Sequence, residues 1–259
     1  MVKKKFNQRY LRIKSRHPSH HCLRRRYGNG ILLPTLALIR FGSTTESNVP
    51  IQINSIEGTK NSASKFRMKK CFKEAQIKSA KFWMDPNEIP EKSFPIVAKL
   101  NYGSRGSGMK KLDSKEDLNN FLKRRNRENY YYEKFYSFTR EYRLHVTEDG
   151  CFYACRKLLK SNTDTKDRWY RNNDNCVWYV EDNPKFNKPE SWDLIVEECV
   201  KALKSLQLDF AACDVKVNKE GEFVVLELNS APSFGEKTEQ EYRKIIPKLY
   251  NKKLKELNS

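Results

Sequence analysis

The sequence predicts a mixed α+β fold in which the strands form antiparallel sheets. Three observations lead to this prediction. Apolar residues recur with helical spacing in separate stretches at 62–75, 191–206 and 238–257. From residue 130 onward the pattern changes to a period of two, which is typical of strands. These strands follow one another instead of alternating with helices, so a run of βαβ units is not expected.

Four elements are predicted in the first half of the chain. Residues 31–41 are apolar and favour a strand, although Pro34 disfavours a central position in a sheet. Ser62 is a suitable N-cap for the helix over 62–75. Residues 94–100 (FPIVAKL) form a short apolar strand. Ser114 caps a second helix over 114–126, whose first turn is acidic.

The second half begins with three successive strands, at YYYEKFY (130–136), EYRLHVT (141–147) and CFYACRKLL (151–159). Residues 160–190 are polar with embedded Trp and Tyr side chains, which indicates a long loop or lid. A helix over 191–206 then precedes a hairpin of 210–217 and 222–228, which turns at residues 218–221. A closing helix runs from about residue 238 to 257.

The size and composition indicate a folded chain with no membrane span. Its 259 residues suffice for one large domain or two small ones, and 14 Phe, 13 Tyr and 4 Trp can build a core. The longest apolar run, 31–39, is too short for a bilayer, which takes about 20 residues. The seven cysteines are an odd number without CxxC pairs, so we expect reduced thiols and a cytoplasmic location.

The positive charge is concentrated at the N-terminus. The chain carries a net charge of +19, and its first carboxylate is Glu46. We therefore interpret residues 1–30 as an extended basic arm. Its cations, interleaved with Tyr and Phe, suit nucleic acid, an acidic protein partner or plain solvation. Charge without a fold motif does not favour nucleic acid over the other two. The arm also holds His17, His20, His21 and Cys22, but no second ligand cluster follows to complete a zinc site.

The C-terminal hairpin carries candidate metal ligands. Glu227 and Asn229 are two residues apart on one strand and share a face, whereas Leu226 and Leu228 are expected to face the core. Asp214, on the partner strand, can face the same side. Two carboxylates and an amide oxygen suit Mg²⁺, which can also bridge phosphate oxygens. The alternative is an ordinary exposed strand face.

A lysine and a glycine-rich loop provide candidate phosphate contacts. Lys99 ends a buried strand, and the loop at 103–108 (GSRGSG) can present several backbone N–H groups to phosphate. The loop lacks the order of glycines of a P-loop or of a Rossmann fingerprint. A flexible surface turn is the alternative.

The segment YYYEKFYSFTREYR adds candidate nucleotide contacts. Glu133 lies where an apolar strand ends and can mark the pocket of a base, and Glu141 can accept from ribose hydroxyls. Arg143, Arg156 and Lys157 supply cations on neighbouring strands. Each of these residues alone is better explained as a surface charge.

Taken together and in this order, the motifs resemble the ATP-grasp superfamily of carboxylate–amine ligases. The pattern is similar to the ribosomal-protein glutamate ligases, D-alanine–D-alanine ligase and small phage-encoded ATP-grasp proteins. The resemblance covers roughly residues 53–250 and is most specific in FPIVAKLNYGSRGSGM and DVKV…VLELNSAP. It implies an α+β ATP-grasp fold, in which two α+β subdomains, residues 62–136 and 137–259, grip ATP between antiparallel sheets. Residues 31–61 are then an abbreviated N-terminal domain.

The resemblance also implies roles for individual residues. Lys65 and Lys99 look like the two ATP-phosphate lysines, and the loop of Ser104, Arg105, Gly106, Ser107 and Gly108 resembles the one that closes over the phosphates. Glu133, Lys134 and Phe135 look like the adenine hinge, and Glu141 like the ribose-binding acid. Arg156 or Lys157 is similar to the γ-phosphate cation. Asp214, Glu227 and Asn229 match the Mg²⁺ ligands, with Glu227 bridging two ions, for which Mn²⁺ can substitute.

The implied activity is ADP-forming amide synthesis through an acyl phosphate, with a carboxylate and an amine as substrates. The short N-terminal domain leaves Arg40 and Ser230 as candidate substrate contacts. Ala212 stands where D-alanine ligases carry an arginine, so Arg143 is a candidate for stabilising the oxyanion. The basic arm and the aromatic 160–190 loop favour an acidic peptide or protein acceptor. The alternatives are an ATP-grasp kinase, or a factor that binds nucleic acid or protein and keeps the scaffold.

Overall fold

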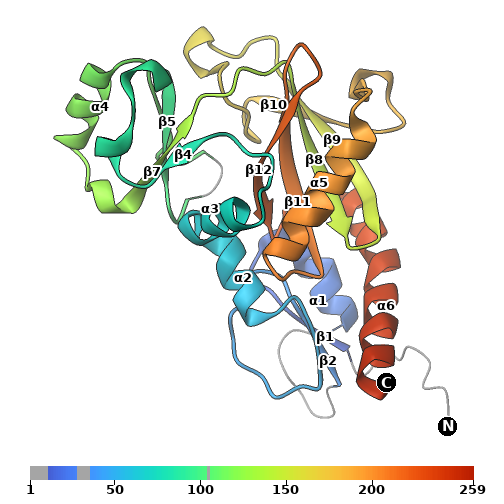
Figure 1. Cartoon of the computed structure of the whole chain (residues 1–259). Helices are drawn as coiled ribbons and strands as arrows, with labels where there is room; N and C mark the ends of the chain where they lie inside the picture. The colour runs from blue at the N-terminus through green and yellow to red at the C-terminus, as the bar shows by residue number, and fades with distance from the viewer. Residues whose placement is uncertain (1–10, 28–35, 104–105) are drawn as a thin grey trace.

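The computed structural model describes residues 11–27, 36–103 and 106–259. The described part of the chain contains three β-sheets and the helices that pack against them. Figure 1 shows a small lobe, which carries α4 and β4–β7, standing beside a larger body formed by the other two sheets. The C-terminal end of α6 (Glu236–Asn258) lies at the end of the body that carries the N-terminal sheet. No helix of the described residues is long and apolar enough to cross a membrane.

The N-terminal sheet is parallel, with the order β1 (Leu11–Lys14), β2 (Ala37–Arg40) and β3 (Ile51–Ile53). Helices α1 (His21–Tyr27) and α6 (Glu236–Asn258) share a core with it, in which Leu11, Ile13 and Tyr242 are buried. The prediction of an extended arm is therefore wrong for residues 11–27. The strand in this segment has buried residues at every second position, but it was not predicted because the surrounding residues are strongly basic. The expectation of antiparallel sheets is also wrong for this one sheet.

The small lobe is an antiparallel sheet covered by a helix. Its strands lie in the order β4 (Phe82–Trp83), β7 (Tyr130–Lys134), β5 (Ile96–Leu100) and β6 (Lys110–Leu112). Helix α4 (Lys115–Leu122) begins after Ser114, whose hydroxyl accepts from the Asp117 N–H, as predicted. Ile96, Ala98 and Leu118 are buried between the helix and the sheet.

Two helices replace the single one predicted over 62–75. They are α2 (Ile56–Ala63) and α3 (Lys65–Glu74), and they are separated by Ser64, whose backbone is extended. The Ser64 hydroxyl accepts from the Arg67 N–H, so Ser64 is the N-cap instead of Ser62. The Ser62 hydroxyl instead donates to Thr59 and Ser230. The break places Lys65 at the start of a helix.

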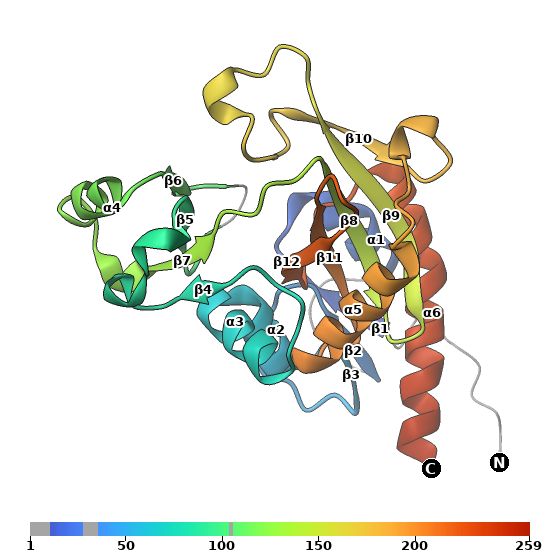
Figure 2. The same ribbon diagram turned by 45° about the horizontal axis from the view of Figure 1, so that its top comes forward.

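The largest sheet is antiparallel and carries most of the candidate site. Its order is β10 (Cys176–Val180), β9 (Gly150–Leu159), β8 (Arg140–Thr147), β11 (Phe210–Val217) and β12 (Phe223–Asn229). Helix α5 (Trp192–Ser205) covers one face of this sheet (Figure 2). The predicted 160–190 loop therefore contains an edge strand. Short 3₁₀ turns occupy Pro18–His20, Pro86–Glu88, Glu91–Ser93, Arg127–Asn129, Thr165–Asp167 and Pro184–Phe186.

Strand alternation separates the core from the site in this sheet. On β11, Cys213 and Val215 belong to the core under α5, whereas Asp214 and Lys216 line a pocket on the other face. A bulge between Asp214 and Val215 pairs Asp214 with Glu227 and Val215 with Val225. The bulge turns Leu226 to the pocket, so only Leu228 faces the core as predicted.

We predict that Gly58→Ala destabilises the fold. A Cβ at Gly58, in α2, would lie 2.3 Å from the backbone oxygen of Gln207, so the helix would have to move. The expected loss is about 1–3 kcal/mol of unfolding free energy, measured by urea denaturation. Gly235→Ala is the matched control, because its Cβ would meet nothing within 4 Å. Equal stability of the two variants would contradict this packing.

Candidate active site

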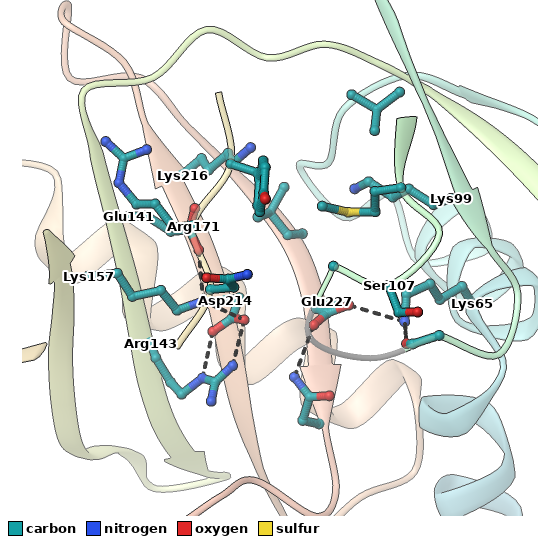
Figure 3. Close-up of a pocket in the computed structure, with 18 of the residues that line it drawn as sticks. Lys65, Lys99, Ser107, Glu141, Arg143, Lys157, Arg171, Asp214, Lys216 and Glu227 are labelled. Carbon is teal, nitrogen blue, oxygen red and sulfur yellow. Dashed lines mark hydrogen bonds and ion pairs between the residues drawn. The ribbon is translucent and has the colours of Figure 1, made fainter. Parts of the chain in front are cut away.

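The candidate site is a pocket between the small lobe and the open face of the large sheet (Figure 3). Its volume is about 370 Å³, within the range usual for small-molecule sites. Seven cationic side chains and four carboxylates of the described residues line it. The cations are Lys65, Lys99, Lys134, Arg143, Lys157, Arg171 and Lys216, and the carboxylates are Glu133, Glu141, Asp214 and Glu227.

Asp214 is held by two cations from neighbouring strands. Arg143, opposite it on β8, donates from Nε and Nη2 to its two carboxylate oxygens at 2.7 and 2.8 Å. Lys157 on β9 donates to Asp214 at 3.0 Å and to Glu141 at 2.7 Å. Burial opposes ionisation of Asp214, but Arg143 and Lys157 outweigh it and hold the pKa of the carboxyl well below its usual range. Asp214 is thus an anion at neutral pH.

Glu227 lies beside Asp214 and faces the lysine that begins α3. The Lys65 Nζ is 3.3 Å from Glu227 Oε2 and donates to the Gly103 carbonyl at 2.8 Å. The Asn229 side-chain amide donates to Glu227 Oε1 at 3.3 Å. Burial opposes ionisation of Glu227, but Lys65 outweighs it and lowers the pKa. The three predicted metal ligands therefore lie on one face, as expected from the hairpin.

Glu133 joins two lysines at the base of the small lobe. Lys69 on α3 donates to its Oε1 at 2.7 Å, and Lys99 on β5 contacts its Oε2. The side chains of Lys69 and Glu133 are 1% and 3% exposed. Burial opposes ionisation of Glu133, but the two lysines lower its pKa to about 2. Lys69 was not predicted from the sequence, since nothing local pairs it with a residue 64 positions away.

The predicted adenine hinge lines the pocket, but part of its backbone is already bonded. The Lys134 N–H donates to the Lys81 carbonyl at 2.7 Å, and the Phe135 N–H donates to the Pro95 carbonyl at 3.0 Å. The Lys134 ammonium donates to the carbonyls of Ser93 and Phe94. The prediction that this backbone reads a base is therefore wrong for these two N–H groups.

The glycine loop approaches the same pocket. Gly106 and Ser107 line it, whereas Ser104 and Arg105 lie outside the described residues. Gly108 has a φ of +71° and packs on Leu100, where a Cβ would lie 2.5 Å from the Leu100 Cδ1. This position therefore requires glycine for its conformation and for its close approach.

Besides Gly108, three predicted site residues among those described do not line the pocket. Arg156 lies on the other face of β9 and donates to the Lys185 carbonyl, so Lys157 is the cation that faces the site. Arg40 is fully buried at the end of β2, where its Nη2 donates to the Thr45 carbonyl. Ser230 is buried and accepts from Ser62 at 2.7 Å. Strand alternation and packing against α2 remove these side chains from the pocket.

Comparisons with known proteins identify the architecture. No family model and no curated protein sequence matches the chain. D-alanine–D-alanine ligase from Bacillus anthracis superposes with a TM-score of 0.68 over 96% of this chain and 97% of its own, at 14% identity. The ATP-grasp ligase PsnB, complexed with a minimal precursor, gives 0.60 over 98% and 100%, at 14% identity. This chain has the ATP-grasp fold. The fold predicted from the sequence motifs is confirmed.

The structure adds pocket residues that the sequence motifs did not single out. His17, which follows β1, lines the pocket, and so do Trp169, Tyr170 and Arg171, which lie in the segment before β10. The Trp178 ring on β10 lies 5.2 Å from the Arg143 guanidinium and 5.3 Å from the Lys157 ammonium. Lys216 was detectable, because it follows Asp214 by two residues on the same strand. The others depend on how a polar loop folds back.

The histidines take no part in a metal cluster. His20 is buried between Ser15 and the Pro232 carbonyl, at 2.7 Å from each. Burial lowers its pKa to about 4. His145 is buried on β8, as predicted for a strand residue, and contacts the Tyr242 hydroxyl at 3.1 Å. No group of three His, Cys, Asp or Glu side chains in the described part of the chain is arranged to hold a metal.

We predict that Glu133→Gln strongly destabilises the protein, because it leaves the Lys69 ammonium buried without its anion. The expected loss is about 3–5 kcal/mol by urea denaturation. Since folding lowers the Glu133 pKa, its contribution is complete above the usual pKa of 4.5 and is lost as the pH falls toward 2. The variant should therefore show less of this acid-dependent loss.

Two controls test this assignment. Lys69→Met combined with Glu133→Gln removes both buried charges and should recover part of the stability. Glu128→Gln, at an exposed glutamate of the same lobe, should change little. A loss below about 1 kcal/mol for Glu133→Gln alone would contradict the buried ion pair.

Proposed function

We propose that this chain is an ATP- and Mg²⁺-dependent carboxylate–amine ligase. The observation that carries the proposal is the excess of cations in a pocket of the ATP-grasp fold, where seven cationic side chains meet four carboxylates. Such an excess suits a polyanion such as a triphosphate. Lys65, which begins α3, and Lys99, on β5 of the small lobe, are the proposed phosphate-binding lysines.

The residues at Asp214 and Glu227 fit magnesium. Mg²⁺ is usually bound by one or two carboxylates together with phosphate oxygens and water, and here two ionised carboxylates share one sheet face. Asn229 donates its N–H to Glu227, so its amide oxygen is the atom available to a cation. Bound Mg²⁺ would neutralise charge on the transferring phosphate. A solved structure of PsnB is complexed with Mg and ADP.

The proposed reaction has two steps. An oxygen of the substrate carboxylate attacks the γ-phosphorus of ATP, the bond to the β-phosphate oxygen breaks, and ADP and an acyl phosphate result. The amine then attacks the acyl carbon, phosphate leaves, and the amine loses a proton to give the amide. In this proposal, Lys65, Lys99 and Lys157 stabilise charge on the phosphates, and Arg143 stabilises the oxyanion. The glycine loop and residues 169–173 would exclude water from the acyl phosphate.

An acidic peptide or protein is the proposed acceptor. A second cavity of about 520 Å³ adjoins the first, and the two share Gly106, Met109, Trp169 and Tyr170. Three lysines, Lys110, Lys111 and Lys166, line this outer cavity together with two carboxylates, Asp113 and Asp167. Its cations suit an acidic segment that leads inward to the reacting groups. The seven free cysteines agree with a reducing compartment such as the cytoplasm.

The alternatives predict different products. A kinase would leave a stable phosphorylated product and would need no amine. A nucleic-acid-binding factor would retain salt-dependent oligonucleotide affinity without turnover. An ATP-dependent phosphate-release screen over amino-acid and peptide mixtures distinguishes these outcomes, because mass spectrometry shows an adduct that has lost water only for a ligase.

We predict that Lys99→Ala weakens ATP binding by roughly 10- to 100-fold, because a charge-assisted phosphate contact is lost. Isothermal titration calorimetry measures the change. Lys123→Ala, at an exposed lysine of the same lobe, is the matched control and should bind as the wild type does. Unchanged affinity for Lys99→Ala would exclude the phosphate role.

We also predict that Glu227→Gln lowers ADP formation by about 100-fold or more while the protein remains folded, because a neutral amide holds Mg²⁺ poorly. Coupled-enzyme assays measure ADP, and thermal unfolding checks the fold. Glu220→Gln, in the exposed hairpin turn, should retain full turnover. Wild-type turnover of the Glu227 variant would refute the assignment of the metal site.

A further inference from the structure

Two cations in the pocket have no anionic partner. Lys65, Lys99, Arg143 and Lys157 each contact a carboxylate, and Lys134 is bonded to backbone carbonyls. The side chains of Lys216 and Arg171, by contrast, form no ion pair or hydrogen bond with any described residue. The buried Nε of Arg171 is an unsatisfied donor.

Both cations lie against one aromatic ring. The Lys216 ammonium is 3.9 Å from the centre of the Phe138 ring, and the Arg171 guanidinium is 4.3 Å from it. Phe138 follows the predicted hinge and precedes β8. An anion bound here would offset the cost of burying two positive groups together.

The position along the strands indicates which anion fits. Asp214 lies opposite Arg143, and two residues farther along β11 Lys216 lies opposite Glu141. This step moves about 6–7 Å from the proposed metal ligands toward the proposed ribose-binding acid. In a nucleotide, the phosphate between the ribose and the metal-bound phosphates is the α-phosphate. Figure 3 shows Lys216, Arg171 and Glu141 grouped at the same end of the pocket.

We propose that Lys216 and Arg171 together bind the α-phosphate of the nucleotide. This inference rests on the proposed ATP-dependent function and adds two phosphate-binding residues to it. Arg171 comes from the segment between β9 and β10, so the contact also joins that segment to the bound nucleotide.

Competition binding tests the proposal through two ligands that differ only in the α-phosphate. Adenosine and AMP each displace a fluorescent ATP analogue from the wild type, from Lys216→Met and from Arg171→Gln. We expect AMP to bind the wild type more tightly than adenosine does. Each variant should weaken AMP binding about tenfold or more and leave adenosine binding unchanged.

Control variants separate charge from folding. Lys216→Arg keeps the charge and should retain most of the preference for AMP, and Lys219→Met, at an exposed lysine of the hairpin turn, should behave as the wild type. Arg171 lies outside the regular strands, so its substitution is expected to disturb folding less than one on β11. Arg171→Gln therefore tests the proposal even where Lys216→Met fails to fold.

Each outcome decides the proposal. An unchanged AMP-to-adenosine preference in both variants overturns it, and so does a wild type that shows no such preference. Either of these results would assign the two cations to another anion, such as a carboxylate of the acceptor. A wild type that binds the ATP analogue and lacks the preference refutes this inference alone, whereas a wild type that binds no ATP analogue refutes the proposed function as well.

Discussion

Pairing of buried opposite charges is the constraint on which the site depends. Asp214 and Glu133 leave water on folding, whereas Glu227 stays partly exposed. Each remains ionised because a lysine or arginine from another element reaches it. Removing one partner would leave an uncompensated charge in a poorly solvated cleft. The same charges are those that a nucleotide and a divalent cation need, so the site is kept ready by contacts among its own side chains.

Strand alternation and one bulge place these charges. Core residues on β8 and β11 face α5, which turns the intervening charged residues to the opposite face. Lys99 faces this sheet from the small lobe and Lys65 from α3, and the break at Ser64 positions Lys65 at a helix start. The site therefore takes cations and carboxylates from both the small lobe and the large sheet.

Local pattern was sufficient for part of this structure. The period-two hairpin predicted that Asp214, Glu227 and Asn229 share a face, and the cap at Ser114 predicted the start of α4. What failed depends on packing between distant segments. Lys69 pairs with Glu133, and Arg171 lies in the pocket. No local sequence pattern predicts either contact, because each joins segments that are far apart in the chain. The parallel N-terminal sheet was missed because β1 is only four residues long and lies within a strongly basic stretch.

The dependence of ATP binding on Mg²⁺ tests the central claim most directly. In the proposed account, Asp214 and Glu227 would hold Mg²⁺, and Lys65 and Lys99 would contact the phosphates that the ion helps to neutralise. Calorimetric titration with ATP should therefore show binding that tightens about tenfold or more when Mg²⁺ replaces EDTA. ATP affinity that is the same with and without Mg²⁺, or no ATP binding at all, would contradict the account.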